Sequence, residues 1–322
     1  MGIIRRLGLE SAVNALASAP RSIEIADGIS GRPLTSIELG PAFERQYGAP
    51  YLTIHRGDLQ SVLVERCRSA GVELTLGYAA VARTDRNAVS FANETYAHHD
   101  LTVVANGINS RLVKDVDRGT SGFVAWRALV ASRELPDGLH STRTGLWLAP
   151  NAHLVHYPVR SGTETNVVLV LARGIRPSEA TFSPVPSALV RRIGDWKDWP
   201  IEDRLVRGRW TDAGFAIIGD AAHAMWPYAA QGGAMAIEDG WTLAVAVKRG
   251  GARATALREW EATRRDRVGS IAAIARRNRR IYHAYGPVRV ARNVVMRSVP
   301  PRLLSRGMRA VYSWEAPSLS SP

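Results

Sequence analysis

A carboxylate at the end of a short apolar run is the group in this chain best placed to do chemistry. The run Phe215–Ile218 predicts a short buried strand, which ends at Gly219 and Asp220. At a strand terminus, the Asp220 carboxylate can accept hydrogen bonds from the hydroxyl groups of a ligand.

A glycine-rich turn and a helix follow this carboxylate. Pro227 closes the loop after the strand. The next turn contains Gln231, Gly232 and Gly233. Because glycine has no side chain, the backbone of this turn can approach a bound group closely. A helix is predicted from Ala234 to Lys248, and its first turn offers unpaired N–H groups at the positive end of the helix dipole. The segment therefore predicts a site for an anionic or carbonyl-rich ligand, the alternative being a crossover that binds nothing.

Two polar side chains share one face of a predicted strand at 153–159. The alternation of a strand places His153 and Tyr157 on one side, and Leu154 and His156 on the other. A histidine near neutral pH can take or relay a proton, and a tyrosine hydroxyl can bind a ring oxygen or a carboxylate. The alternative is a hydrogen-bonded sheet histidine beside a tyrosine that packs across strands.

Two further polar groups lie where predicted elements begin or end. Arg56, in the run IHRGDL, precedes a helix, and its guanidinium can make paired hydrogen bonds to phosphate. The alternative is a local ion pair or a helix cap, with Asp58 as the capping residue. Asn106 follows a predicted buried strand at Leu101–Ala105.

Taken together, these motifs resemble the single-component FAD-dependent aromatic hydroxylases, in particular the salicylate hydroxylase and 6-hydroxynicotinate 3-monooxygenase group. The resemblance rests mainly on the run GDAAHAMWPYAAQGGAMAIEDG at 219–240, with HRGDL at 55–59 and an H-x-x-H-Y-P run at 153–158. It implies that Asp220 holds the ribityl region of FAD. It also implies that Pro227 and the turn at 231–233 lie along the isoalloxazine ring.

The same resemblance implies roles for the other polar residues. Arg56 would reach the FAD pyrophosphate. His153 and Tyr157 would lie in the substrate pocket, where His153 would deprotonate or orient the substrate. The family has an Asp where this chain has Asn106, which keeps hydrogen bonds to backbone or cofactor without adding charge. The implied reaction is hydroxylation of a small aromatic acid, with NAD(P)H reducing the flavin and O2 supplying the oxygen.

One family motif is missing from the sequence. The family begins with a strand, a G-x-G-x-x-G turn and a helix, and no G-x-G-x-x-G occurs in this chain, although the resemblance covers Gly2 to about Pro287. We therefore expect either a start codon placed too far downstream or a truncated copy. The alternative function is a truncated, non-enzymatic remnant that cannot retain FAD.

The composition is strongly basic, with 42 Lys+Arg against 29 Asp+Glu and a net charge of +13. Nucleic-acid or membrane-surface binding is a third hypothesis, but no zinc-finger spacing or RNP-like pattern supports it. Arginines such as Arg264, Arg265 and Arg267 are expected on a solvated helix face, with a homodimer contact as a further expectation. The single cysteine fits a cytoplasmic protein, no apolar run reaches the length of a membrane span, and no metal site is predicted.

The predicted fold class is α/β with α+β character. It comprises a truncated FAD-binding Rossmann-like sheet, an inserted antiparallel β substrate domain and C-terminal helices. The expected domains are a partial FAD-binding domain at 1–118 with a β-hairpin at 22–39, a substrate domain at 119–205, a return to the FAD-binding domain at 206–262, and a C-terminal helical region at 263–322.

Several elements are predicted from periodicity and turn residues. Helices are expected over the first 20 residues, around Cys67, at 187–193 and at 253–280. The substrate-domain strands are expected at 123–130, 145–148, 153–159 and 166–172. A strand is expected at 72–76, and a turn at 85–87 is expected to join strands at 79–81 and 88–91.

Overall fold

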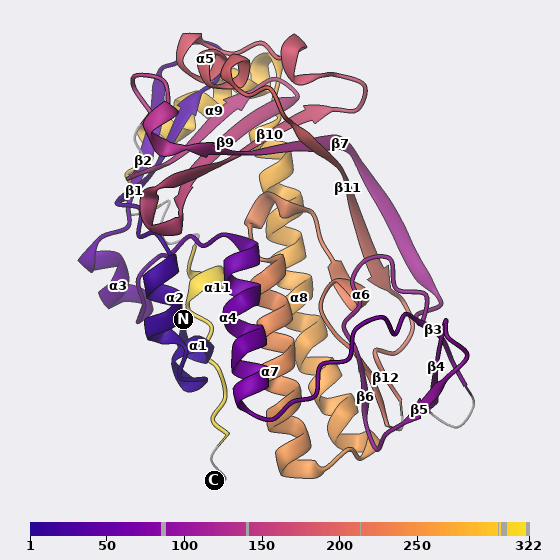
Figure 1. Cartoon of the computed structure of the whole chain (residues 1–322). Coiled ribbons are helices and arrows are strands. Elements are labelled where there is room, and N and C mark those ends of the chain that lie inside the picture. Colours follow the sequence, from indigo (N-terminus) through magenta and orange to yellow (C-terminus); the bar gives the residue numbers. More distant parts are fainter. Residues whose placement is uncertain (85–87, 140–141, 213, 302, 304–307, 320–322) are drawn as a thin grey trace. The chain divides into compact units, whose positions relative to one another are not determined.

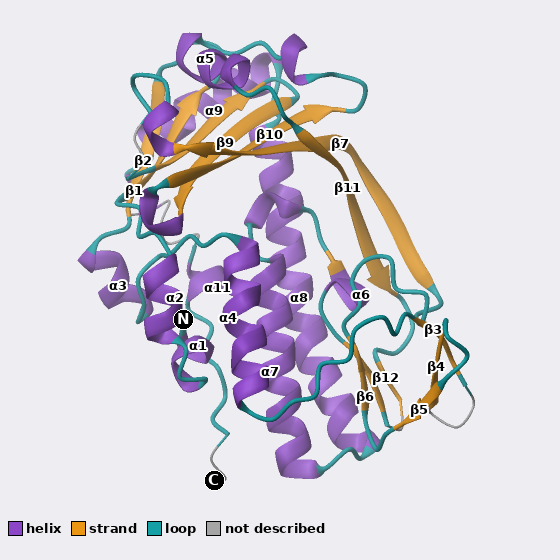
Figure 2. Ribbon diagram, viewed as in Figure 1, coloured by secondary structure: helices purple, strands orange, loops and turns teal. Residues whose placement is uncertain are grey.

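The computed structural model describes residues 1–84, 88–139, 142–212, 214–301, 303 and 308–319. The chain forms two compact units, each built from three separate stretches. The first unit contains residues 1–72, 122–201 and 278–314, and the second contains 73–121, 202–277 and 315–322. Figures 1 and 2 trace the chain and its helices and strands.

A seven-stranded sheet with the order β11-β7-β10-β9-β8-β1-β2 dominates the first unit. Its strands are β1 (Ser22–Asp27), β2 (Pro33–Glu38), β7 (Val116–Ala131), β8 (Thr144–Ala149), β9 (Ala152–Val159), β10 (Glu164–Ala172) and β11 (Lys197–Val206). The predicted hairpin at 22–39 and the predicted strands of the substrate domain are confirmed. The sheet is mixed rather than purely antiparallel, because β1 pairs parallel with β8 and so attaches the hairpin to the sheet.

The two faces of this sheet have different coverings. Leu154 and Leu169 point to a core that includes Leu189 of α5 (Pro184–Arg192). On the opposite face, Val155 packs with Tyr282 and Met296, from the end of α8 (Ala254–Tyr282) and from α9 (Gly286–Ser298). The period of two predicted for β9 is therefore confirmed, and it places His153 on the face that meets α8.

Short helices complete the first unit. They are α1 (Gly2–Arg6), α2 (Glu10–Leu16), α3 (Pro41–Tyr47), α4 (Arg56–Ser69) and α11 (Arg309–Tyr312), with 3-10 turns η1 (Ser132–Glu134), η2 (Arg160–Gly162) and η3 (Pro177–Glu179). The prediction of one helix over the first 20 residues is wrong. Gly8 has a φ of 71°, in the left-handed region, so the chain turns between α1 and α2.

The second unit contains two small sheets and long helices. Its strands are β3 (Ala80–Arg83), β4 (Ala88–Phe91), β5 (Tyr96–His98), β6 (Thr102–Val104), β12 (Thr211–Asp212) and β13 (Phe215–Ile217). The remaining elements are α6 (Asp220–His223), η4 (Pro227–Ala229), α7 (Gly232–Gly250) and most of α8. Among the described residues, no helix combines the length and the apolar character needed to cross a membrane.

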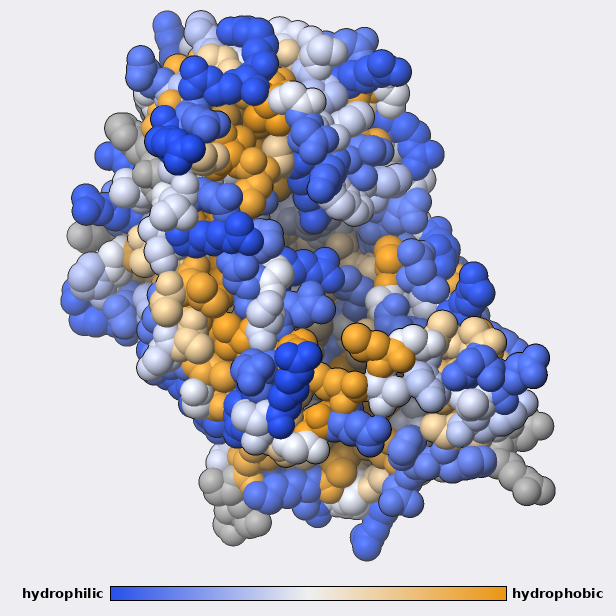
Figure 3. All heavy atoms as spheres, viewed as in Figure 1, coloured by the Kyte–Doolittle hydropathy of each residue, from blue (hydrophilic) through white to orange (hydrophobic). Residues whose placement is uncertain are grey.

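Three sequence predictions for this unit have different outcomes. The strand expected at 72–76 is wrong: the segment pairs with no described strand, and the side chain of Leu76 is 90% exposed. The strand at 101–105 exists as β6, but Val103 is 41% exposed, because β6 is an edge strand with one covered face. The turn expected at 85–87 lies outside the described residues. Figure 3 shows apolar side chains reaching the visible surface among hydrophilic ones.

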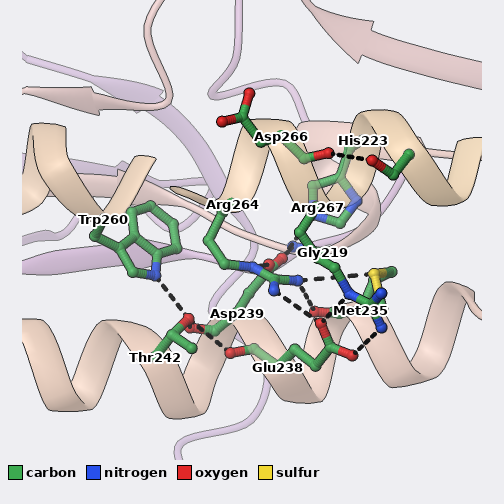
Figure 4. Close-up of polar contacts among 11 residues, drawn as sticks. Gly219, His223, Met235, Glu238, Asp239, Thr242, Trp260, Arg264, Asp266 and Arg267 are labelled. Atoms are coloured by element: carbon green, nitrogen blue, oxygen red, sulfur yellow. Dashed lines mark hydrogen bonds and ion pairs between the residues drawn. The ribbon is translucent and has the colours of Figure 1, made fainter. Parts of the chain in front are cut away.

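A buried ionic network holds the segment after β13 against α7 and α8 (Figure 4). The Asp239 carboxylate accepts hydrogen bonds from Gly219 N–H at 2.8 Å and from Arg264 Nε at 2.7 Å. It also lies 2.6 Å from Nε2 of His223. A carboxylate only accepts hydrogen bonds, so this ring nitrogen carries the proton. Asp239 therefore joins three parts of the chain.

The charges of this network are largely balanced within the core. Burial raises the pKa of Asp239, but the hydrogen bond from His223 and the positive charge of Arg264 outweigh that effect and lower it. Glu238 accepts bonds from Arg264 at 2.8 Å and from Arg267 at 3.1 Å.

The prediction that the arginine run lies on a solvated face is wrong. Arg264 is only 1% exposed, and Arg265 pairs with Glu261 at 2.7 Å. The acidic partners of these arginines are two α7 residues and one residue of α8 itself.

Replacing Arg264 with methionine would leave the buried carboxylates Glu238 and Asp239 without their main counter-charge. Breaking a buried ion pair in this way costs about 3–5 kcal/mol. We expect the free energy of unfolding, measured by urea denaturation, to fall by about that amount. The matched control is Arg258→Met at an exposed position of α8, which should change it by less than about 0.5 kcal/mol. Equal effects of the two substitutions would contradict a stabilising network.

His156 makes the first unit sensitive to acid. Its ring packs so closely on β8 that a Cβ atom at Gly145 would lie 2.0 Å from Nε2 of His156, which requires glycine there. Burial lowers the pKa of His156 from 6.5 to about 4. The unfolded chain therefore takes up this proton first as the pH falls, and stability is lost below pH 6.5.

We expect the free energy of unfolding to decrease between about pH 6.5 and 4, with His156 contributing at most about 3 kcal/mol. His156→Gln removes this titration and should reduce the slope of that part of the profile, while the buried His153 and His283 continue to contribute. The exposed His99, replaced in the same way, is the control. An unchanged slope in His156→Gln would show that His156 is not the group responsible.

Candidate active site

The cofactor-side residues predicted from the sequence begin at one edge of the small sheet in the second unit. β6 and β13 are parallel neighbours, and Ile218 N–H donates to Val104 O at 2.9 Å. The loops that follow the two strands leave from the same edge. Asn106 and Asp220 each come shortly after a strand end, and both are exposed.

The turn at Gly219 needs its glycine and presents the next residue to solvent. Gly219 has φ 59° and ψ −146°, and a Cβ atom there would lie 3.2 Å from Cβ of Ala236. Its N–H is held by Asp239, as described above. Asp220 is then the first residue of α6, and no hydrogen bond reaches its carboxylate within the described part of the chain. That carboxylate is therefore available to a ligand hydroxyl.

The N-terminus of α7 lies close to this carboxylate. A Cβ atom at Gly232 would be 3.9 Å from Oδ1 of Asp220. Gln231 is the N-cap residue and makes no side-chain capping bond, so the first-turn N–H groups keep their capacity to bind an acceptor. Ala230 adopts a left-handed φ of 51° after η4, whose first residue, Pro227, is exposed. Carboxylate and helix N-terminus thus come together as the sequence predicts, and Gly233 is exposed beside them.

In the first unit, His153 forms a buried pair with a second histidine. Nδ1 of His153 lies 2.7 Å from Nε2 of His283, and the Tyr282 ring lies 5.3 Å from the His153 ring. Burial, and then His283, hold the pKa of His153 well below its usual value. Burial and the charge of Arg279 lower the pKa of His283 to about 3. His153 is thus neutral near pH 7.

Tyr157 and Arg127 share the sheet face of His153. Arg127 of β7 lies opposite Val168 of β10, and Val168 in turn lies opposite Val155 of β9. On β9, Val155 lies midway between His153 and Tyr157, so all of these side chains are on one face of the sheet. Burial raises the pKa of the half-buried Tyr157, while the charge of Arg127 lowers it. Burial lowers the pKa of Arg127, and within the described residues its Nε has no hydrogen-bond partner and no carboxylate pairs with it. This cation on an aromatic-rich face suits a ligand carboxylate.

Arg56 is the first residue of α4 and is exposed. Within the described part of the chain, no hydrogen bond or ion pair to its guanidinium occurs, and its charge acts on Arg127 by lowering that pKa. The capping alternative for Asp58 is wrong. His55 is the N-cap residue, and Asp58 instead accepts a bond from Arg160 Nε at 3.1 Å. Arg56 therefore adds a second cation in the first unit that is available to an anion.

The sequence did not predict the roles of Arg127, His283 and Asp239. Arg127 could have been found from the alternation of its strand, since it is the charged position in an otherwise apolar stretch. His283 and Asp239 gave no signal, because their partners are 130 and 16 residues away. The structure groups the predicted residues into two sets, with Arg56, His153 and Tyr157 in the first unit and the other predicted residues in the second.

Comparisons with known proteins place this geometry in a family. Residues 1–275 match the FAD binding domain family. The chain is 31% identical to 3-hydroxybenzoate 6-hydroxylase of Polaromonas naphthalenivorans, over 96% of this chain and 82% of that protein. It is 28% identical to 6-hydroxynicotinate 3-monooxygenase of Pseudomonas fluorescens, over 86% of this chain and 78% of that protein.

Solved structures show the same fold. HpxO of Klebsiella pneumoniae, complexed with FAD and uric acid, superposes with a TM-score of 0.82 at 23% identity, over 95% of this chain and 83% of that one. A salicylate hydroxylase substrate complex gives a TM-score of 0.76 at 19% identity, over 99% and 89%. The predicted α/β fold class with α+β character and C-terminal helices is confirmed, and the structure shows that the main sheet is large and mixed. The chain belongs to the FAD binding domain family, as the resemblance of its motifs to the FAD-dependent aromatic hydroxylases predicted.

Proposed function

We propose that this chain is an FAD-dependent monooxygenase that hydroxylates a small aromatic acid with NAD(P)H and O2. The observation that carries the proposal is the segment from β13 to α7, which sets an unbonded carboxylate beside an uncapped helix N-terminus. Relatives with 31% and 28% identity that hydroxylate 3-hydroxybenzoate and 6-hydroxynicotinate support the reaction class. We place the reaction in the cytoplasm, where NAD(P)H is available.

The residues of the second unit fit the flavin half of FAD. Asp220 would accept hydrogen bonds from ribityl hydroxyls, and the N–H groups at 231–233 would bind flavin carbonyl oxygens. Gly219 and Pro227 would shape the backbone around the ring, and Asn106 would add uncharged hydrogen bonds. In the first unit, Arg56 would bind the pyrophosphate of the same cofactor. When bound and reduced, FAD supplies the activation of O2.

The residues of the first unit would bind and prepare the aromatic acid. Arg127 would pair with its carboxylate, and Tyr157 would hydrogen-bond to the ring substituent or the carboxylate. A neutral His153 protonated at Nδ1 donates that hydrogen to Nε2 of His283 and leaves its own Nε2 as an acceptor. It would then orient a substrate hydroxyl and relay its proton, since an electron-rich phenolate is the more reactive form.

Purified protein incubated with FAD, NADH or NADPH, and 3-hydroxybenzoate or 6-hydroxynicotinate tests the proposal. We expect a flavin absorbance band after gel filtration, substrate-stimulated oxidation of the nicotinamide, and a hydroxylated product in equal amount. A chain that retains no flavin would be the non-enzymatic remnant. Retained flavin without product would refute the hydroxylase assignment.

Asp220→Asn keeps the size of the side chain but removes its charge. Because the carboxylate makes charge-assisted hydrogen bonds to hydroxyls, we expect the Kd for FAD, measured by quenching of flavin fluorescence, to rise about tenfold. Asp220 is exposed, so thermal stability without FAD should be unchanged. The exposed Asp266→Asn in α8 serves as a control. An unaltered Kd in Asp220→Asn would remove Asp220 from the cofactor site.

His153→Gln retains a hydrogen-bonding group but cannot relay a proton. We expect kcat for hydroxylation to fall about 10²-fold or more, the usual contribution of a positioned acid–base group, while FAD affinity stays the same. His156→Gln, on the opposite face of the same strand, should keep kcat near the wild-type value at neutral pH. Similar kcat values for wild type and His153→Gln would exclude the relay.

A further inference from the structure

A cavity in the second unit lies next to the loop that follows α6. It measures about 200 Å³, and its walls come from residues 203–205 of β11, which belong to the second unit, from the end of α6, from the loop at 224–226 and from α8. Trp210, His223 and Trp226 provide aromatic walls, while Gly269 and Ala272 provide a floor of small side chains. The family match assigns no role to this cavity, and none of the proposed cofactor or substrate residues line it.

Three residues that line the cavity are almost fully buried and carry a polar atom without a hydrogen-bond partner in the described structure. Arg204 and Trp210 are 1% exposed, and His223 is 3% exposed. The unpartnered atoms are Nε of Arg204, Nε1 of Trp210 and Nδ1 of His223. Two of them are obligate N–H donors, and an unsatisfied buried donor costs about 1–3 kcal/mol. An occupant rich in acceptors would remove this cost.

Arg204 carries a buried positive charge beside the cavity. Its terminal nitrogens bind only backbone carbonyls, at Ile108, Ser110 and Val113, and no carboxylate pairs with it among the described residues. A buried cation without an anion is unfavourable, and burial together with Arg118 lowers the pKa of Arg204. Arg276, exposed at the cavity on α8, provides a second cation for which the described structure shows no partner. Asp203 also lines the cavity, but two guanidinium groups without carboxylate partners outnumber this one carboxylate, so the charges around the cavity favour an anion.

We propose that this cavity binds a small aromatic carboxylate at a site separate from the proposed substrate site. The carboxylate would accept from the buried N–H donors and pair with guanidinium groups, and the ring would pack between the tryptophans. Met225 and Trp226 line the cavity and directly precede Pro227, so an occupant would restrain the loop that shapes the cofactor site. The site stands independently of the proposed function.

Benzoate and its neutral isostere benzamide, titrated by calorimetry into the purified protein with and without added FAD, test the proposal. Flavin absorbance is followed in parallel to separate binding near the flavin from binding elsewhere. We expect benzoate to bind at a site that leaves the flavin spectrum unchanged, at least about tenfold more tightly than benzamide. This spectrally silent binding should persist even if no hydroxylation is found. Equal affinity for benzamide, or no silent binding, would overturn the proposal in favour of a water-filled cavity.

Two neighbouring alanines of α8 offer a matched pair of variants. Ala272→Leu fills the cavity and should weaken the silent binding at least about tenfold, whereas Ala273→Leu at an exposed position should leave it unchanged. Arg276→Gln should weaken benzoate binding but not benzamide binding, which keeps the test decisive if Ala272→Leu unfolds. Wild-type benzoate affinity in Arg276→Gln and in folded Ala272→Leu would refute the site.

Discussion

The buried carboxylate of Asp239 accepts three hydrogen bonds that hold the elements of the second unit together. Asp239 receives Gly219 N–H, His223 and Arg264, and these three groups come from the end of a strand, a short helix and the long helix α8. Because all three bonds end on one side chain, the turn after β13 has a fixed geometry relative to α7. That geometry leaves Asp220 beside the N-terminus of α7, where a ligand can use both.

The charged groups of the two units differ in whether they are paired, and so suit different ligands. In the second unit, the buried charges around Asp239 are paired with one another, and the groups at 220 and 231–233 remain open to a ligand. In the first unit, the histidine pair is neutral because it is buried, and Arg127 and Arg56 lack carboxylate partners in the described structure. A flavin and a substrate carboxylate would each find the groups that suit them.

Local patterns predicted most of the elements and the motif residues. The alternation around His153 and the turn residues before Leu34 predicted strands correctly, since each depends only on nearby residues. The strand expected at 72–76 failed because a strand requires a partner, which sequence alternation does not reveal. The roles of Arg264 and His283 were missed for the same reason, as both depend on residues brought together by folding. The four-domain division remains a prediction, although the structure also draws each unit from several stretches of chain.

The reaction proposed for this chain transfers one oxygen atom from O2 to an aromatic acid with the help of a bound flavin. The most direct measurement is mass spectrometry of the product formed under ¹⁸O2 with FAD, NAD(P)H and a hydroxybenzoate. We expect one ¹⁸O atom in each product molecule. A product whose new oxygen comes from water, or labelled peroxide with an unmodified substrate, would contradict it.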